Sequence, residues 1–423
     1  MRSAIESVVG NHSIYNPRRQ EFNTGQKVPF RVSPTPFYLS TEQKLGLQNL
    51  GHDIADYFKA VDEMYVKNFE GIRTILDKGK PQIFLTDQPS HYLFIKPDLI
   101  ITPQGFSICE IETSPFGLAL AEILNRAYQN QGFETMIADG TLPAQIQNST
   151  PAEGSLIYSR KTQAYSGQMT FLADEVFSGN KRNWEAEEAD NFKVTDQQNI
   201  YRGFYLGEYL TDPNIKFLLD RQIDNGNILI PSPTPHMEEK AILTLLYDKR
   251  YEGYLRKRLG DASFNHLRAS IPPCWIVGQE KFFSPGMPKN ITSSIDLARF
   301  SKSKRAFVLK ESGFSENCSW KEGVHFLQRE STEKSLQLLH DAETDKSRLY
   351  IVQEFRKGEN IPMQYETEDG NAQVPMTARV RLTPYFSVAD DGQNGKLIAI
   401  KATGCENTDF IHATSTSINT AVN

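Results

Sequence analysis

The sequence predicts a mixed α/β (α+β) protein, and two patterns carry that prediction. Between residues 151 and 235, short apolar strands such as "GSLIYS" alternate with helical stretches such as "TQAYSGQMTFLADEVFS" and "NIKFLLDRQI", which is typical of βαβ units around a sheet. Elsewhere, apolar strands meet at short turns, as in "PDLIITPQGFSICEIE". The 423 residues are enough for two or three domains or one composite enzyme fold.

Composition and charge exclude several classes of protein. The net charge of -6 provides no basic field, so we expect no nucleic-acid partner and no attachment to an anionic membrane. No apolar run approaches the roughly 20 residues that span a bilayer, and the first residues lack the apolar stretch of a signal peptide. The four cysteines are far apart in the sequence, so neither a zinc ribbon nor a disulfide framework is indicated. We expect a cytoplasmic protein.

Changes in composition divide the chain into four predicted segments. Residues 1–40 are polar and contain prolines, which predicts an extended N-terminal arm. Residues 41–150 begin with apolar residues at helical spacing behind a cap-like Ser40 or Thr41, and they include the hairpin quoted above. Residues 151–235 form the α/β segment, and the Pro-rich "PSPTPH" marks the start of the last segment, 236–423.

Four further stretches receive local assignments. The acidic "GNKRNWEAEEAD" is expected to be a solvated loop, and the following "NFKVTD" a strand. "EEKAILTLLYDKRYEGYLRKRLG" and "GVHFLQRE" are expected to be helical. These assignments rest on local propensity and on the spacing of apolar residues.

The hairpin, with strands over 99–101 and 106–111, carries three acids at one end. Glu110 and Glu112 are two residues apart on a strand, so they share a face, and Asp98 ends the neighbouring strand. Carboxylates this close raise each other's pKa unless a positive charge offsets them. Mg²⁺, which binds one or two carboxylates together with phosphates and water, would do so. The alternative is a polar strand end with solvated acids.

Lys310 ends the apolar strand "AFVLK" directly before the loop "ESGFSENCS". The backbone N–H groups of that loop, with Ser312 and Gly313 at its start, are suited to cradling phosphates, and a lysine at its root supplies a point charge. The alternative is an ordinary lysine at the surface end of a strand.

A second strand, "LYIVQEF", ends in Gln353, Glu354 and Phe355. Its backbone groups would be available to the edge of an adenine, and Glu354 to a ribose hydroxyl. The alternative is a strand end that simply enters a loop.

Three cations lie on two neighbouring strands near the end of the sequence. Arg379 and Arg381 alternate in "ARVRL", so they face the same side, and Lys401 lies in the next strand, "AIKATG". Such a group suits an anionic substrate or a phosphorylated intermediate. The alternative is a charged outer face.

Taken together, these pieces resemble the ATP-grasp ligases, in the circularly permuted order of the glutathionylspermidine synthetase-like group, with an additional α/β segment. The resemblance covers roughly residues 90–130 and 236–405. The family places Arg-x-Asp on one strand and Glu-x-Asn on the next, and this chain has Lys96-Pro97-Asp98 and Glu110-Ile111-Glu112. Lys96 therefore stands where the family has Arg, and Glu112 where it has Asn.

The resemblance implies roles for individual residues. Asp98, Glu110 and Glu112 would bind two Mg²⁺ ions, and Lys96, Arg381 and Lys401 would stabilise negative charge during the reaction. ATP would contact a third group of residues: Lys240, Lys310, Ser312, Gly313, Gln353, Glu354 and Phe355. The stretch "SGFSENCS" would close over the phosphates.

The activity implied is that of an ATP-dependent carboxylate–amine ligase that forms an amide through an acyl phosphate and releases ADP and phosphate. Its substrates would be a small-molecule or peptide carboxylate and an amine, with residues 151–235 shaping their pocket. Arg160 and Arg202 are candidate carboxylate anchors, or else surface arginines. A homo-oligomer is compatible with the sequence. Two alternatives stay open: an ATP-binding scaffold or sensor without catalysis, and an ATP-grasp phosphotransferase.

Overall fold

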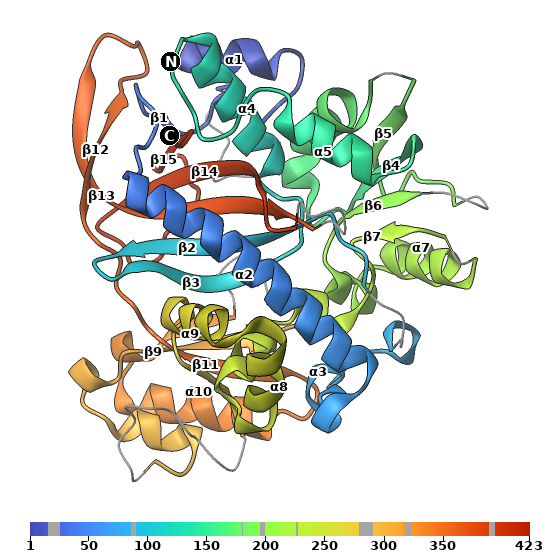
Figure 1. Cartoon of the computed structure of the whole chain (residues 1–423), viewed down its shortest axis with the longest axis vertical. Helices are drawn as coiled ribbons and strands as arrows, with labels where there is room; N and C mark the ends of the chain where they lie inside the picture. Colours follow the sequence, from blue (N-terminus) through green and yellow to red (C-terminus); the bar gives the residue numbers. More distant parts are fainter. Residues whose placement is uncertain are drawn as a thin grey trace.

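A computed structural model describes residues 1–15, 26–85, 90–179, 181–194, 199–225, 227–278, 291–315, 317, 323–388 and 394–423. Within these ranges the chain forms helices and three β-sheets (Figure 1). The α-helices are α1 (Arg2–Val9), α2 (Thr41–Val66), α3 (Arg73–Leu76), α4 (Leu118–Asn130), α5 (Thr141–Ser149), α6 (Ser166–Leu172), α7 (Pro213–Asp224), α8 (Lys249–Leu259), α9 (Asp261–Ser270) and α10 (Thr332–Thr344).

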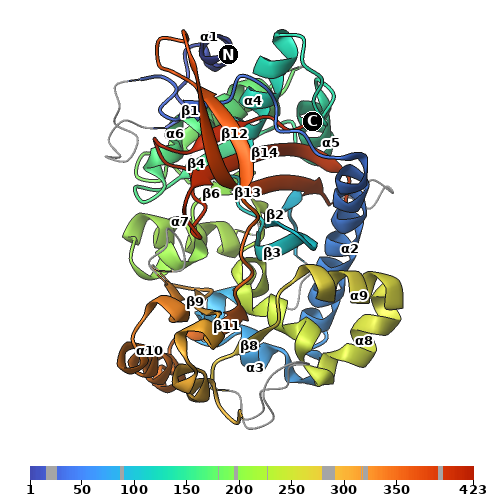
Figure 2. The same cartoon turned by 90° about the vertical axis from the view of Figure 1, so that its left-hand side faces the viewer.

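The largest sheet combines strands from both ends of the sequence. Its order is β1-β15-β14-β13-β2-β3, and β12 pairs with the outer half of β13. The long β12–β13 hairpin crosses in front of the sheet in Figure 2. The strands are β1 (Arg31–Val32), β2 (Phe94–Thr102), β3 (Gly105–Glu112), β12 (Ile361–Glu366), β13 (Gln373–Ser387), β14 (Leu397–Glu406) and β15 (Ile418–Thr420).

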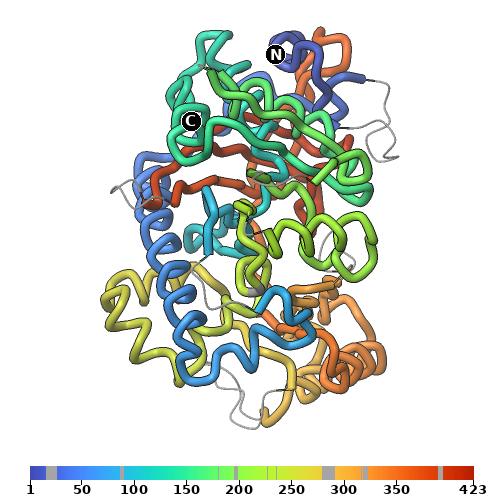
Figure 3. Tube along the Cα trace, turned by 90° about the vertical axis from the view of Figure 1, so that its right-hand side faces the viewer, coloured from blue at the N-terminus to red at the C-terminus, as the bar shows by residue number. Residues whose placement is uncertain are grey.

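Two four-stranded sheets complete the fold. The antiparallel sheet has the order β10-β9-β11-β8, with β8 (Cys274–Ile276), β9 (Phe307–Ser312), β10 (Val324–Phe326) and β11 (Leu349–Glu354). The parallel sheet has the order β5-β4-β6-β7, with β4 (Glu153–Tyr158), β5 (Asn183–Glu188), β6 (Ile200–Gly203) and β7 (Leu229–Ile230). The parallel sheet belongs to the green part of the chain, which lies on the side facing the viewer in Figure 3.

Separate hydrophobic clusters cover the two faces of the largest sheet. Leu99 of β2 and Leu382 of β13 belong to a cluster with the apolar face of α2. Phe94 and Tyr385, from the same two strands, belong to a second cluster that includes α4. Because neighbouring side chains of a strand point to opposite faces, β2 and β13 are buried on both sides.

Helix α2 confirms the start predicted from the sequence. Ser40 caps it: the Gln43 N–H donates to the Ser40 hydroxyl at 3.1 Å, and the Gln43 side chain accepts from the Ser40 N–H at 2.9 Å. This reciprocal pair is a capping box, which satisfies backbone donors left free at a helix start. Helix α7 also lies where the sequence predicts a helical segment.

The local assignments of four stretches were wrong, wholly or in part. The expected acidic loop contains strand β5, an edge strand anchored by Trp184, which is 2% exposed, while Glu185 on the opposite face is exposed. The residues of "NFKVTD" that are described, 191–194, are not a strand. "GVHFLQRE" contains β10 and a 3-10 turn over Leu327–Arg329 instead of an α-helix. The helical prediction for "EEKAILTLLYDKRYEGYLRKRLG" is confirmed, as a 3-10 helix over Lys240–Tyr247 followed by α8. The arm is not extended throughout, since it includes α1.

Candidate active site

The β2–β3 hairpin is longer than the sequence predicts and carries a bulge among its acids. Asp98 lies opposite Glu110 and Lys96 opposite Glu112, whereas Leu99 pairs with Ile108, so that Cys109 is the extra residue. A bulge changes where the following side chains point. Here it allows Leu99 and Ile108 to be fully buried while the two acid-bearing positions remain directly opposite each other.

Each of the three predicted metal-ligating acids is paired with a cation. Asp98 Oδ2 lies 2.8 Å from Arg381 Nη1, and Glu110 Oε1 lies 2.9 Å from Lys240 Nζ. Glu112 forms an ion pair with Lys96. Burial acts to raise the pKa of Glu112, but Lys96, Lys240 and the Ser114 hydroxyl together outweigh burial and lower that pKa.

The geometry does not support the prediction that the three acids converge as metal ligands. Within the described ranges, no three acidic, histidine or cysteine side chains gather in an arrangement that would hold a metal ion. Asp98 and Glu110 nevertheless lie side by side, and two carboxylates fit a Mg²⁺ ion that is bound mainly by phosphates and water. Glu112 instead accepts a hydrogen bond from the Ser114 hydroxyl at 2.9 Å.

The predicted lysines are buried, which excludes ordinary surface positions for them. The exposed fractions are 7% for Lys96 and Lys310, 6% for Lys240 and 4% for Lys401. Burial of a charged ammonium is costly unless partners compensate it. These four side chains are therefore held by specific contacts inside the protein.

Lys310 connects the antiparallel sheet to the hairpin. Its Nζ donates to the backbone carbonyl of Cys109 at 2.8 Å and to Gln353 Oε1 at 2.7 Å. Because a lysine only donates, it fixes the Gln353 amide with Oε1 toward Lys310. Gln353 Nε2 is then a buried donor that has no hydrogen-bond partner within the described part of the chain.

Lys401 differs from the other lysines in its partners. Its Nζ donates to the Thr403 hydroxyl at 3.2 Å, and no carboxylate of the described residues lies within ion-pair distance. Burial, together with the positive charges of Arg381 and Lys96, lowers the pKa of Lys401 to about 7. A substantial fraction of this amine is therefore neutral near pH 7.

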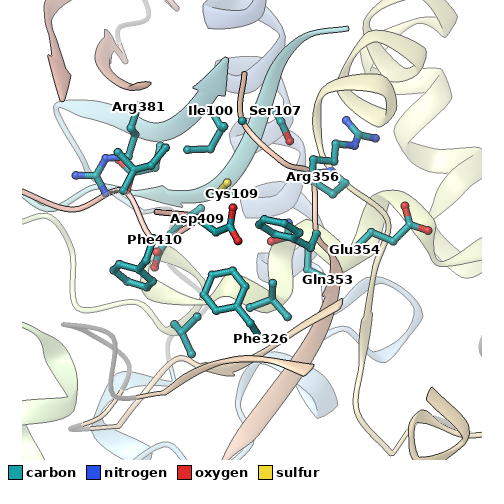
Figure 4. Close-up of a pocket in the computed structure, with 18 of the residues that line it drawn as sticks. Ile100, Ser107, Cys109, Phe326, Gln353, Glu354, Arg356, Arg381, Asp409 and Phe410 are labelled. Carbon is teal, nitrogen blue, oxygen red and sulfur yellow. Dashed lines mark hydrogen bonds and ion pairs between the residues drawn. The ribbon is translucent and has the colours of Figure 1, made fainter. Parts of the chain in front are cut away.

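An apolar cavity lies between the hairpin and the antiparallel sheet (Figure 4). Lys310 and Gln353 lie in its wall, and the side chain of Glu354 extends away from its centre in the figure. Burial raises the pKa of Glu354. Aromatic and aliphatic side chains make up much of the remaining wall: Ile100, Val308, Val324, Phe326, Phe355, Phe410 and Ile411.

A charged cavity lies next to the apolar cavity. Four cations and three carboxylates line it: Lys96, Lys240, Arg381 and Lys401, with Asp98, Glu110 and Glu112. The two cavities share the side chains of Asp98, Glu110, Val324, Arg381 and Phe410. A ligand in one cavity therefore lies against the same acids and arginine as a ligand in the other.

Ser312, at the start of the predicted phosphate loop, is hydrogen-bonded to Glu239, the residue before Lys240. Glu239 forms an ion pair with Lys80 and accepts a hydrogen bond from the Ser312 hydroxyl. Gly313 has φ +78°, and a Cβ there would meet the Glu239 carboxylate, so only glycine fits. Of the rest of that loop, residues 316 and 318–322 lie outside the described ranges.

The remaining candidate arginines have protein partners. Arg160 forms an ion pair with Asp190, with a side chain that is 73% exposed. Arg202 is buried and forms an ion pair with Glu238, so it is not a surface arginine. Arg379 lines the apolar cavity and forms an ion pair with Asp409.

Sequence reasoning missed an aromatic part of the charged cavity. Tyr15, Phe116, Tyr165 and Tyr205 line it, and they come from distant segments of the chain. Thr383 was missed as well, although it lies two residues after Arg381 and its hydroxyl donates to Asp98 Oδ1 at 3.3 Å. The alternation that singled out the two arginines would have placed Thr383 on the same face.

Comparisons with known proteins identify the fold. No family model matches the chain, and no curated protein matches its sequence. Among solved structures, the chain is similar to a glutathione synthetase-like effector from Globodera pallida in its apo form, with a TM-score of 0.54 and 11% sequence identity. The match covers 93% of this chain and 90% of that one. At this identity the likeness concerns the fold alone, which is mixed α/β and glutathione synthetase-like. No helix among the described residues is long and apolar enough to cross a membrane.

Proposed function

We propose that this protein is an ATP-dependent carboxylate–amine ligase with a circularly permuted ATP-grasp architecture. The observation that carries the proposal is the shared wall of the two cavities, with Asp98, Glu110 and Arg381. A nucleotide in the apolar cavity and an acid in the charged cavity would meet at that wall. The glutathione synthetase-like fold supports the same assignment, and the hairpin's position before the ATP-side sheet in the sequence supports the permuted order.

The apolar cavity suits the base of ATP. Its aromatic and aliphatic wall matches a flat heterocycle, and the buried Gln353 Nε2 donor requires an acceptor atom. Lys310, at the root of the predicted phosphate loop, offers positive charge toward the shared wall. Cys109, whose thiol pKa is raised by burial, contributes packing rather than reactivity.

The chemistry takes place at the shared wall. A carboxylate oxygen attacks the γ-phosphorus, the bond to ADP breaks, and an acyl phosphate forms. The amine nitrogen then attacks the acyl carbon, the C–O bond to phosphate breaks, and the nitrogen loses a proton. Lys96, Arg381 and Lys401 offset the negative charge that develops. Mg²⁺ held by Asp98 and Glu110 would neutralise charge on the phosphates.

The test is transfer of oxygen from the acid to phosphate. Purified protein is incubated with Mg-ATP, a panel of amines and acids labelled with ¹⁸O in the carboxylate, and the released phosphate is analysed by mass spectrometry. A ligase transfers one ¹⁸O to phosphate and yields ADP and an amide. Glu110→Ala serves as the inactive control, and full activity of that variant would contradict the role of the hairpin.

A second candidate is an ATP-binding scaffold or sensor, and one observation favours it. All three hairpin acids already have cationic partners, so their charge is compensated without a metal ion. Binding of ATP without any release of ADP, across the whole panel, would support this candidate. A phosphorylated product without amide would instead identify a phosphotransferase.

A further inference from the structure

Four aromatic side chains form one wall of the charged cavity, here called the aromatic wall: Tyr15, Phe116, Tyr165 and Tyr205. The rings of Phe116 and Tyr165 are stacked, with centroids 4.7 Å apart. The Tyr205 ring lies 5.1 Å from Phe116, and the Tyr15 ring 5.9 Å from Tyr165. Tyr165 and Tyr205 are only partly buried, so ring surface remains available to a ligand.

The aromatic wall adjoins the buried amine of Lys401. Gly117, next to Phe116, packs so closely that a Cβ there would lie 3.2 Å from Lys401 Cε. The carbonyl of Phe116 accepts a hydrogen bond from Lys96 Nζ at 3.5 Å and another from the Tyr385 hydroxyl at 3.0 Å. The ring of Phe116 is thus fixed relative to the cationic part of the cavity.

The charges of the cavity leave one cation for a ligand. Lys96, Lys240 and Arg381 are each paired with one of the three hairpin carboxylates. Lys401 has only the Thr403 hydroxyl as a hydrogen-bond partner among the described residues. Lys401 is therefore the one cationic side chain of the described lining without a carboxylate partner, and each hairpin carboxylate already has a cation. This favours an anionic ligand over a cationic one, because a ligand carboxylate beside Lys401 would also favour the protonated amine.

We propose that the charged cavity binds a monocarboxylic acid with an aromatic body, its carboxylate at Lys401 and its ring against the aromatic wall. This proposal rests on the proposed function only in taking that acid as the acyl substrate of the ligase. A polyamine would find no free carboxylate in the described lining. A dicarboxylate would bring a second negative charge against the rings, where no cation is available.

Binding is measured by calorimetry without nucleotide, so that the result does not depend on turnover. The probes are 3-phenylpropionate, propionate, succinate and spermine. We expect the Kd of 3-phenylpropionate to be at least 10-fold lower than that of the other three. Lys401→Met should remove this binding and Lys401→Arg should restore most of it, because arginine keeps the charge.

The aromatic wall is tested by Phe116→Leu, which should raise the Kd of 3-phenylpropionate about 10-fold and leave that of propionate unchanged. Phe133→Leu is the matched control, because Phe133 is a partly buried aromatic residue that lines neither cavity; its Kd values should equal those of the wild type. Circular dichroism and the urea midpoint show whether each variant is folded.

Equal Kd values for 3-phenylpropionate and propionate would overturn the proposal, as would tighter binding of spermine or succinate. So would unchanged binding in both Lys401→Met and Phe116→Leu. The proposed function fails separately. If aromatic acids bind but ¹⁸O never reaches phosphate, the protein is not a ligase, and the proposal of an aromatic monocarboxylic acid as ligand is retained. If only aliphatic acids are activated, the proposal of an aromatic ligand is contradicted, and the ligase activity is retained.

Discussion

The two cavities differ in the partners of their buried lysines and arginines. In the apolar cavity, Lys310 is held by two neutral acceptors, the carbonyl of Cys109 and the amide of Gln353. In the charged cavity, three of four cations are matched by carboxylates. Lys310 therefore has no carboxylate partner among the described residues, and in the charged cavity the same is true of Lys401 alone.

This difference separates recognition of shape from recognition of charge. A mostly apolar wall with few polar groups selects a flat ligand and fixes its orientation. A wall of paired ions selects ligands by their net charge. Substitution of one ion of a pair is poorly tolerated, because it leaves the other buried charge uncompensated. The two cavities should therefore respond differently to substitutions of similar size.

Breaking the contact that holds the start of the predicted phosphate loop should have the largest effect. Glu239→Ala leaves Lys80, whose side chain is 2% exposed, as an unpaired buried cation, and it removes the acceptor of the Ser312 hydroxyl. We expect unfolding free energy to fall by about 3–5 kcal/mol, measured by urea denaturation.

The double variant Glu239→Leu with Lys80→Met is the control for that loss. It removes both charges, so most of the stability should return. A loss below about 1 kcal/mol in Glu239→Ala would mean that the pair is solvated, as exposed ion pairs are.

Removing the cation of the apolar cavity should weaken nucleotide binding. Lys310→Met deletes the ammonium group and leaves the Cys109 carbonyl and Gln353 Oε1 without a donor. We expect the Kd of Mg-ATP, measured by calorimetry, to rise about 100-fold, which is about 2.7 kcal/mol. Lys304→Met, at an exposed position of the same region, should leave the Kd unchanged; an equal change in both variants would remove Lys310 from the site.

The charged cavity predicts a dependence of stability on pH. Lys401 has a pKa of about 7 in the folded protein, below its ordinary 10.5, so the unfolded chain binds more protons between these values. Stability therefore rises with pH in that window. From pH 7 to 9, the wild type should gain about 2 kcal/mol more than Lys401→Met, measured by urea denaturation at both pH values. Parallel curves for the two proteins would contradict the lowered pKa.

The smallest effect concerns the backbone at the border of the charged cavity. Gly117 (φ +85°) and Gly132 (φ +82°) have the same backbone conformation, but a Cβ would meet Tyr385 and Lys401 only at Gly117. Changing either residue to Ala should cost about 1 kcal/mol for the left-handed conformation. Gly117→Ala should cost a further fraction of that from contacts at 3.1 and 3.2 Å. If urea denaturation shows equal losses of unfolding free energy for the two variants, the Lys401 side chain moves away from the added methyl group at little cost.

The features that were predictable from sequence are those carried by a few neighbouring residues. The acids of the hairpin stand out because charge interrupts an apolar pattern, and Lys310 because it ends an apolar strand. The cationic partners of the acids were not predictable, since Lys240 and Glu110 are 130 positions apart and only the fold brings them together. The same holds for Tyr15 and Tyr205, which look like ordinary aromatic residues in the sequence.

Strand β5 shows a second limit. Its residues, Asn183–Glu188, have the composition of a solvated loop, and one buried tryptophan is the only local sign of a strand. Pairing with β4 supplies the stability that propensity does not. Charge patterns in the sequence thus located side chains that line the two cavities, but they did not predict this edge strand.

The shared side chains of Asp98, Glu110 and Arg381 have a thermodynamic consequence. If a ligand in one cavity draws Arg381 away from Asp98, it changes the electrostatic potential felt by a ligand in the other. Linkage then requires that each ligand alter the affinity of its neighbour by the same factor. The affinity for a ligand in one cavity then depends on whether the other cavity is occupied, even if the protein does not catalyse a reaction between the two ligands.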